Sequence, residues 1–408
     1  MNNNSEDPRL PNEILVMIID NLANDLSSLY NISLVCRDLS VISRACIFRK
    51  LRLAPKKRIE RFRSLLSDPK SKSISGFVRS LDMSLELAVA EDLQSSVFIL
   101  EHLPSLTDIA IESAQTPHLE VMKTCLGNKL RELWIYLPYN VFEGLQDLLI
   151  SLTTLKLLSL SGCNGSNMDH MESALILPGS LETLSLTLPL AGRAFHSIGL
   201  GIEVACPPAL HTLYVEFDWS ERYGPQDRSV LWRGLGLHVK AVVDIRWRPS
   251  SLMTELSKAA SAMFRCMQGF RAPQLTFSCS QSPFVVPQFA RYISNLPRCV
   301  REIFIDIDAK PDLGLGKRPL LDSDVAAWSV LDTAMSQRHG DLNGLMRICF
   351  RCTVRTRDAR YTISSESTMF ASGGKPDRTI LDRIPKLLPL SNGLGIIEID
   401  RDTHFFEF

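Results

Sequence analysis

An apolar spacing that recurs after residue 70 constrains the fold of this chain more than any other feature. Its clearest copy is the segment 155–164, in which Leu155, Leu158 and Leu160 are followed by Cys163 and Asn164. Apolar and other residues alternate at its centre, as in a short strand with one buried face. Further copies begin roughly 24 to 29 residues apart, at Val78, Leu106, Leu130, Leu181 and Leu210.

This spacing matches the leucine-rich repeat form L-x-x-L-x-L-x-x-C/N. In that form each strand points its leucines into a solenoid core and the residues between them outward on a concave face. Apolar residues at helical spacing lie between the strands, at 91–102, 118–126, 141–151 and 168–176. The alternation predicts an irregular leucine-rich-repeat-like α/β solenoid with parallel strands and convex helices. The alternative is a generic α/β domain whose strands happen to begin with leucine.

The repeats become irregular after residue 218. Weaker copies begin at Val300, Leu345 and Leu394, and their wider spacing implies insertions or missed repeats. Only the copy at Leu155 carries the Cys/Asn position cleanly. We therefore assign residues 78–408 to one repeat-like domain that is degenerate after 218, and leave its repeat number and its C-terminal architecture open.

A small helical unit is predicted before the repeats. One helix covers 10–22, with Pro11 in its first turn; a second begins near Asp25, a good N-cap; a third runs over about 37–48. The first helix is apolar on two faces, because Val16 and Met17 add to the residues at helical spacing. A unit this small and this apolar is best explained by a partner that covers it.

Four short segments of this unit resemble the F-box motif over about residues 8–50: Leu10-Pro11-x-Glu13-Ile14-Leu15-x-x-Ile18, Asp25-Leu26, Ser33-Leu34-Val35-Cys36-Arg37-Asp38 and Phe48-Arg49. The family usually has a large aromatic residue where this chain has Leu39. The resemblance implies binding to a Skp1-type adaptor and, through it, to a cullin scaffold. It implies adaptor-facing or supporting roles for Leu10, Pro11, Ile14, Leu15, Ile18, Leu34, Val35 and Cys36. The alternative is that these residues form the core of a helical cap on the following domain.

The combination of an F-box with irregular repeats resembles many fungal F-box proteins, which implies a substrate receptor of a ubiquitin ligase with no catalytic group of its own. Outward strand residues are the natural substrate contacts, and the candidates are Trp134, Tyr136, Tyr214 and Glu216. The same side chains could instead pack against terminal loops. Two rival hypotheses are an adaptor-bound scaffold without a role in ubiquitination and an enzyme whose site is assembled from distant residues.

Composition and the remaining motifs argue for an intracellular interaction protein. Lys plus Arg and Asp plus Glu both number 45, so no net field draws the chain to nucleic acid or to a membrane. No membrane span or signal peptide is recognisable, so the ten cysteines should be reduced in the cytoplasm or nucleus. We expect no metal or cofactor. The tempting motifs are better explained as ordinary strand or loop residues: Cys349-x-x-Cys352, Gly314-x-Gly316-Lys317 and the pair Asp306 and Asp308.

A basic run occupies residues 44–63, where seven Lys and Arg residues from Arg49 to Arg61 face a single acid, Glu60. We assign residues 1–8 to a flexible N-terminus, 9–50 to the F-box and 51–77 to a solvated helical linker. A nuclear-import signal or a contact with an acidic partner is the sharper alternative for the basic run.

Overall fold

The computed structural model describes most of the chain in two compact units, 1–133 and 134–408. The described residues are 11–22, 25–54, 56–69, 71–84, 90–137, 142–162, 174–186, 192–218, 242–248, 274–279, 290, 293–294, 296, 298–308, 322–340, 344–355 and 379–406. The expected flexible segment 1–8, Leu10 and the loop at Gly314 lie outside the described residues.

The first unit opens with three short helices, as the sequence predicts: α1 (Asn12–Asn21), α2 (Leu26–Ser33) and α3 (Arg37–Arg49). Asp25 caps α2, since its carboxylate accepts the Ser28 backbone N–H at 3.1 Å and the Ser28 hydroxyl at 2.6 Å. These hydrogen bonds to the charged form lower the pKa of Asp25. Both α1 and α2 pack on α3 and bury Ile19 and Leu29 there.

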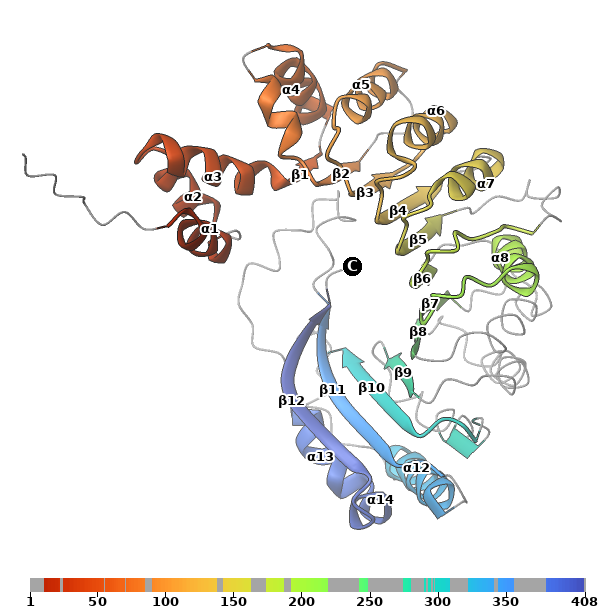
Figure 1. Ribbon diagram of the computed structural model, residues 1–408. Coiled ribbons are helices and arrows are strands. Elements are labelled where there is room, and N and C mark those ends of the chain that lie inside the picture. Colours follow the sequence, from red (N-terminus) through yellow and green to blue (C-terminus); the bar gives the residue numbers. More distant parts are fainter. Residues whose placement is uncertain are drawn as a thin grey trace, which may run out of the picture. The chain divides into compact units, whose positions relative to one another are not determined.

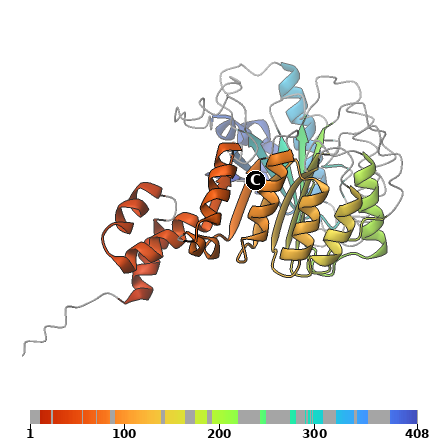
Figure 2. The same ribbon diagram turned by 90° about the horizontal axis from the view of Figure 1, so that it is seen from above.

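Parallel strands follow at once. The strands β1 (Lys50–Leu53), β2 (Ser80–Ser84) and β3 (Asp108–Glu112) pair in chain order. The helices lie on one side of these strands (Figures 1 and 2), namely α4 (Lys56–Ser67), the 3-10 turn η1 (Lys72–Gly76), α5 (Ala90–Glu101), α6 (Thr116–Val121) and the π-helical turn η2 (Met122–Leu126). The division between the two units falls within β4 (Glu132–Leu137).

The second unit continues the same alternation. Each of its strands from β5 to β12 pairs in parallel with the next, over Leu157–Gly162, Thr183–Leu186, Thr212–Asp218, Val242–Arg248, Gln274–Cys279, Glu302–Asp308, Arg347–Arg355 and Ile397–Phe406. Its described helices lie on one side of the strands (Figure 1): α7 (Phe142–Ser151), α8 (Gly192–Val204), α12 (Asp322–Gly340), α13 (Thr379–Leu387) and α14 (Pro389–Gly393). The chain is therefore a leucine-rich-repeat-like α/β solenoid fold preceded by three helices.

The predicted inward positions form the core of the repeats. In the copies that begin at Leu106, Leu155 and Leu181, all three apolar positions are buried. The strand register places Leu158 opposite Leu184, and Leu184 opposite Leu213. Neighbouring repeats thus bury their leucines against one another, which a single repeat cannot do alone.

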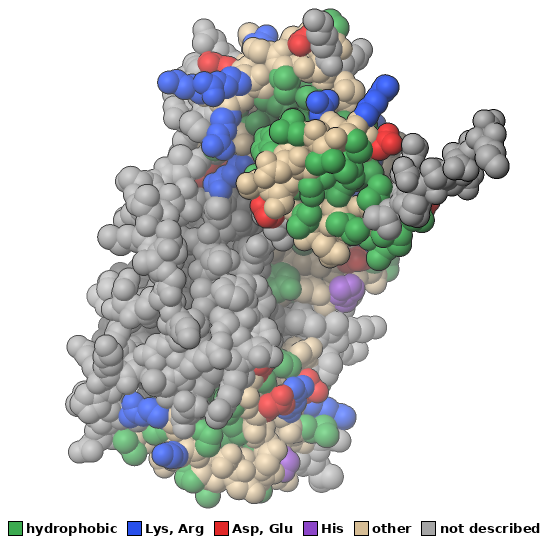
Figure 3. Space-filling view, turned by 90° about the vertical axis from the view of Figure 1, so that its left-hand side faces the viewer, with side chains coloured by type: hydrophobic (Ala, Val, Ile, Leu, Met, Phe, Trp, Pro, Cys, Tyr) green, Lys and Arg blue, Asp and Glu red, His purple; other side chains and the backbone are tan. Residues whose placement is uncertain are grey.

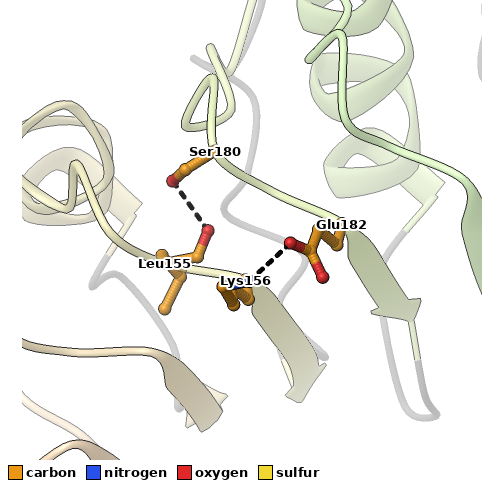
Figure 4. Close-up of polar contacts among 4 residues, drawn as sticks. All are labelled: Leu155, Lys156, Ser180 and Glu182. Atoms are coloured by element: carbon orange, nitrogen blue, oxygen red, sulfur yellow. Dashed lines mark hydrogen bonds and ion pairs between the residues drawn. The ribbon is translucent and has the colours of Figure 1, made fainter.

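The backbone just before each strand ties neighbouring repeats together. The carbonyl oxygen of Lys156 accepts the N–H groups of both Glu182 and Thr183 at 2.8 Å. The Ser180 hydroxyl donates to the Leu155 carbonyl oxygen at 2.8 Å, and Lys156 Nζ lies 2.7 Å from Glu182 Oε1 (Figure 4). The Lys156–Glu182 pair is exposed, so the backbone bonds are the stronger constraint on spacing.

Two strands after residue 218 that sequence analysis missed are β8 and β9. Val243 of β8 and the buried Leu275 of β9 occupy the same register as Leu213. Three residues before Val243 and Leu275, where the pattern requires a leading leucine, the chain has Lys240 and Ala272. By contrast, β10, β11 and β12 pair directly with one another, so the wide spacing there reflects insertions.

Three predictions of local structure need correction. The segment 51–77 does contain a helix, α4, but Lys50 already begins β1, and α4 buries Ile59, Phe62 and Leu66. This segment is therefore a repeat rather than a solvated linker. In the predicted helix 168–176, residues 174–176 are not helical, and the remainder lies outside the described residues. Leu394 is 47 % exposed, because it caps α14 instead of opening a buried strand.

The non-helical segment at 174–178 is held between two helices by hydrogen bonds. The Ile176 N–H donates to Gln146 Oε1 of α7 at 2.8 Å, and Gln146 Nε2 donates back to the Ile176 carbonyl oxygen at 3.3 Å. The Leu175 N–H donates to the Ser197 carbonyl oxygen of α8 at 2.8 Å. These bonds satisfy backbone groups that a helix would have paired internally.

The C-terminal helices are joined by one buried carboxylate. Asp332 of α12 accepts the N–H groups of Leu390 and Ser391, each at 2.8 Å, in the first turn of α14. A buried carboxylate is stable only when such donors satisfy it. The interaction fixes α14 directly before β12, and so positions the last strand.

We predict that Gly201→Ala destabilises the second unit by about 1 to 3 kcal/mol or more. A Cβ at Gly201 of α8 would lie 1.8 Å from the Leu175 carbonyl oxygen, so the helix and the segment would have to separate. Urea unfolding followed by circular dichroism measures the loss. Gly179→Ala is the matched control, because its Cβ would meet nothing within 4 Å. Equal midpoints for the two variants would contradict the close approach.

We predict a pH-dependent stability that comes from His118. Its Nδ1 accepts the Gln115 N–H at 3.1 Å, which leaves Nε2 to donate to the Ser96 hydroxyl at 2.7 Å. Burial lowers the pKa of His118 from 6.5 to about 4. Between these values the unfolded chain binds a proton that the folded chain excludes. The free energy of unfolding therefore falls with falling pH, by up to about 1.4 kcal/mol per pH unit.

The measurement is urea unfolding of the chain and of His118→Asn between pH 7 and 5, above the usual range of carboxylates. The amide of the variant can still accept the Gln115 N–H, but it does not titrate. We expect a shallower dependence on pH for the variant. Identical slopes would show that folding does not lower the pKa of His118.

Candidate functional site

The helix α1 presents apolar side chains on two opposite faces. Leu15 and Ile19, four residues apart, face the other helices, and Ile19 is fully buried. Ile14, Met17 and Ile18 recur at three- and four-residue spacing on the outer face and are exposed, Met17 by 63 %. The inner face is sufficient to hold α1 on α3, so the outer face is not needed for folding.

The second helix and the turn after it extend this exposed apolar surface. Leu29 of α2 is fully buried, whereas Leu26 and Tyr30, also four residues apart, are exposed. The turn is held by backbone bonds from Leu34 N–H to Asn31 O and from Val35 N–H to Ile32 O, each 3.1 Å long. It projects both side chains outward, with Leu34 83 % and Val35 71 % exposed.

These side chains form one cluster. Nine of the sixteen exposed large hydrophobic residues in the described part of the chain lie between Ile14 and Val41. Figure 3 shows hydrophobic side chains gathered over the N-terminal helices on a single face. We call the following set the N-terminal apolar patch: Ile14, Met17, Ile18, Leu26, Tyr30, Leu34 and Val35. Monomeric proteins rarely leave such a concentrated patch in water, so it indicates a surface that another molecule covers.

One ion pair joins α1 to α3. Arg49 Nη1 lies 3.7 Å from Asp20 Oδ1, and the Cys46 thiol donates to the same oxygen at 3.6 Å. Burial raises the pKa of Cys46, and the nearby Asp20 adds to this effect, so the thiol stays neutral. The Arg49–Asp20 pair is exposed and contributes little to stability.

The structure exposes most of the residues that the F-box resemblance implicates. Pro11 and Cys36 are exposed, in addition to Ile14, Ile18, Leu34 and Val35 of the patch, whereas Leu15 is half-buried and supports α1 from inside. Leu10 lies outside the described residues. Sequence reasoning did not assign Met17, Leu26 and Tyr30 to the site. Their helical spacing to Ile14 and Leu34 was the signal that could have found them.

The predicted substrate contacts on the strands are not brought together. Trp134 and Tyr136 of β4 and Tyr214 of β7 are half-buried. The strands β5 and β6 lie between them in the sheet order, and β6 places Ser185 opposite Tyr214. The side chain of Glu216 in β7 lies outside the described residues. The structure therefore gives two separate aromatic positions rather than one cluster.

The remaining motifs form no site within the described residues. Cys349 is buried in β11, as expected for an ordinary strand residue, and the side chain of Cys352 is not described. Asp306 and Asp308 lie in β10, and their side chains are likewise not described. No group of three or more potential metal ligands occurs among the residues that the structure describes. None of the described helices is both long and apolar enough to cross a membrane.

Comparison with known proteins yields similarity to solved structures but not to known sequences. No family model and no curated protein sequence matches the chain. Among solved structures, the leucine-rich repeat-containing protein LegL7 from Legionella pneumophila aligns over 74 % of this chain and 90 % of its own, with 13 % identity and a TM-score of 0.40. The fold description above therefore rests on the strands and helices of the chain itself.

We predict that the N-terminal apolar patch contributes almost nothing to folding. Leu34→Ala should change the free energy of unfolding by less than about 0.5 kcal/mol, because Leu34 is largely exposed. Leu29→Ala, in the same helical unit, should cost about 2 to 5 kcal/mol, because Leu29 is fully buried. Chemical unfolding of both variants measures the difference. Comparable losses would show that Leu34 is a core residue.

Proposed function

We propose that the three N-terminal helices bind a Skp1-type adaptor and that the chain acts as the substrate-recognition subunit of a Skp1-cullin-F-box ubiquitin ligase. The observation that carries the proposal is the N-terminal apolar patch. Its position agrees with the resemblance of residues 8–50 to the F-box motif, and most residues that the resemblance implicates are accessible. A helical unit that keeps a second apolar face in water is suited to docking on a partner.

The repeats supply the second half of the proposed activity. Among the described residues between the inward leucines, Trp134, Tyr136 and Tyr214 are half-buried and thus partly accessible, and we assign the contacts with a target protein to them. Ubiquitin transfer then depends on proximity, because the receptor holds a target lysine near the loaded conjugating enzyme at high effective concentration. In this mechanism the chain contributes binding surfaces and no catalytic group.

The proposal predicts a one-to-one complex with a Skp1-type adaptor. The full chain is co-expressed with the adaptor, and co-elution is measured by size-exclusion chromatography with light scattering. Met17→Asp/Leu34→Asp should abolish the complex, because two charges would be buried against an apolar partner. Both side chains are exposed, so the variant should still fold. Addition of the cullin then tests whether the adaptor-bound chain joins the ligase.

The matched control is Ile150→Asp in α7, whose side chain is 64 % exposed but lies far along the chain from the patch. It should keep the complex. A wild-type chain that folds but does not co-elute with the adaptor would refute the proposal. Adaptor binding without cullin recruitment would instead indicate an adaptor-bound scaffold.

A further inference from the structure

The helix α4 carries three chemically different faces. Ile59, Phe62 and Leu66 are buried, and they face the strands. A polar groove of about 700 Å³ lies along the flank that meets α5, and it is lined by Glu60, Arg63, Ser64, Ser67, Asp68, Gln94 and Ser95. Arg63 already has partners within this groove, since it donates to the Ser95 hydroxyl at 3.0 Å and its guanidinium carbon lies 5.5 Å from the centre of the Phe98 ring.

The third face is turned away from the strands and borders the groove, because Lys57 and Ser64 are seven residues apart, and it is cationic. Lys57 and Arg61 lie one helical turn apart with Arg58 beside them, and all three are exposed. Among the described residues, none of the three makes an ion pair or a side-chain hydrogen bond. We call Lys57, Arg58 and Arg61 the basic flank of α4.

The basic flank belongs to the first helix of the repeats, which follows the N-terminal helices and β1 in the chain. The strand β1 stands first in the sheet order, so α4 has α5 on one side and no repeat helix on the other. The helix α3 runs directly into β1 and also contacts η1. Figure 3, which views this end of the first unit, shows Lys and Arg side chains beside the hydrophobic cluster.

We infer that the partner covering the N-terminal apolar patch carries an acidic protein segment that lies against the basic flank of α4. This rests on the proposed function for the location of the partner. Three unpaired cations beside an apolar docking face match a partner with carboxylates next to its apolar groove. An acidic protein segment fits better than nucleic acid, because the chain has a formal net charge of zero and the adjoining surface is apolar.

The structure also disfavours an import signal as the role of this basic run. An import signal of the short basic type is read as an accessible chain segment. In this chain, however, Ile59, Phe62 and Leu66 hold the run as a packed helix. The cations can therefore act on a partner only as a fixed, preformed surface.

The test compares the association of the full chain with a Skp1-type adaptor, measured by biolayer interferometry at low and high salt. Lys57→Glu/Arg58→Glu/Arg61→Glu should lower the association rate about tenfold at low salt and remove most of its salt dependence. The dissociation rate should change little. Arg298→Glu/Arg301→Glu/Lys386→Glu is the control, because it makes the same change in net charge at exposed residues of the second unit. It should leave the association rate close to that of the wild type.

A second probe separates this inference from the proposed function. A fluorescein-labelled Asp/Glu peptide should bind the wild type at low salt, lose binding in the α4 variant, and still bind Met17→Asp/Leu34→Asp. If the adaptor does not bind the wild type, the proposed function is wrong. Binding of the peptide then tests separately whether the basic flank binds acidic segments. Equal behaviour of the α4 and control variants toward both probes would overturn the inference. A single-stranded oligonucleotide that outcompetes the peptide would overturn it as well.

Discussion

The fold depends on the stacking of three inward apolar positions from one repeat to the next. Parallel pairing places Leu158 beside Leu184 and Leu184 beside Leu213, and each repeat covers the leucines of its neighbour. The carbonyl groups before β1, β2, β3, β5, β6 and β10 accept N–H groups of the next repeat, which fixes the distance between these strands and their neighbours whatever connects them. Both constraints act at the strands, so the connections can vary greatly in length, as they do between β10, β11 and β12.

This constraint explains which parts of the fold the sequence predicts. A complete set of apolar positions, as at Leu106 or Leu155, is a sufficient signal for a strand. Where the leading residue is Lys240 or Ala272, pairing with neighbours on both sides still holds the strand, but the pattern no longer reveals it. At Leu175 the sequence predicts a helix that the structure does not contain. The backbone there bonds instead to Gln146 and Ser197, which belong to other repeats. Helix propensity is a local property of the sequence, so it does not predict hydrogen bonds to residues this far along the chain.

The candidate site was predictable in kind but not in detail. The composition of α1 indicates two apolar faces, since a helix that buried one side only would have polar residues at Ile14 and Ile18. Which face is free depends on how α1 sits on α3, and that packing buries Ile19 while leaving Met17 in solvent. The exposure of Leu34 depends in turn on the backbone turn that ends α2. Tertiary packing, rather than periodicity, decides both.

The junction between α3 and β1 determines how a partner on the patch is presented. Arg49 ends the helix, Lys50 begins the strand, and the Arg79 N–H donates to the Arg49 carbonyl oxygen at 2.9 Å. No linker separates them, so the N-terminal helices are continuous with the first repeat, and bending at this point would break a bond of the repeat ladder. The partner proposed above would therefore meet α4 in one fixed orientation. Because that orientation is fixed before binding, charges on the flank of α4 can guide association without an added cost of ordering a flexible arm.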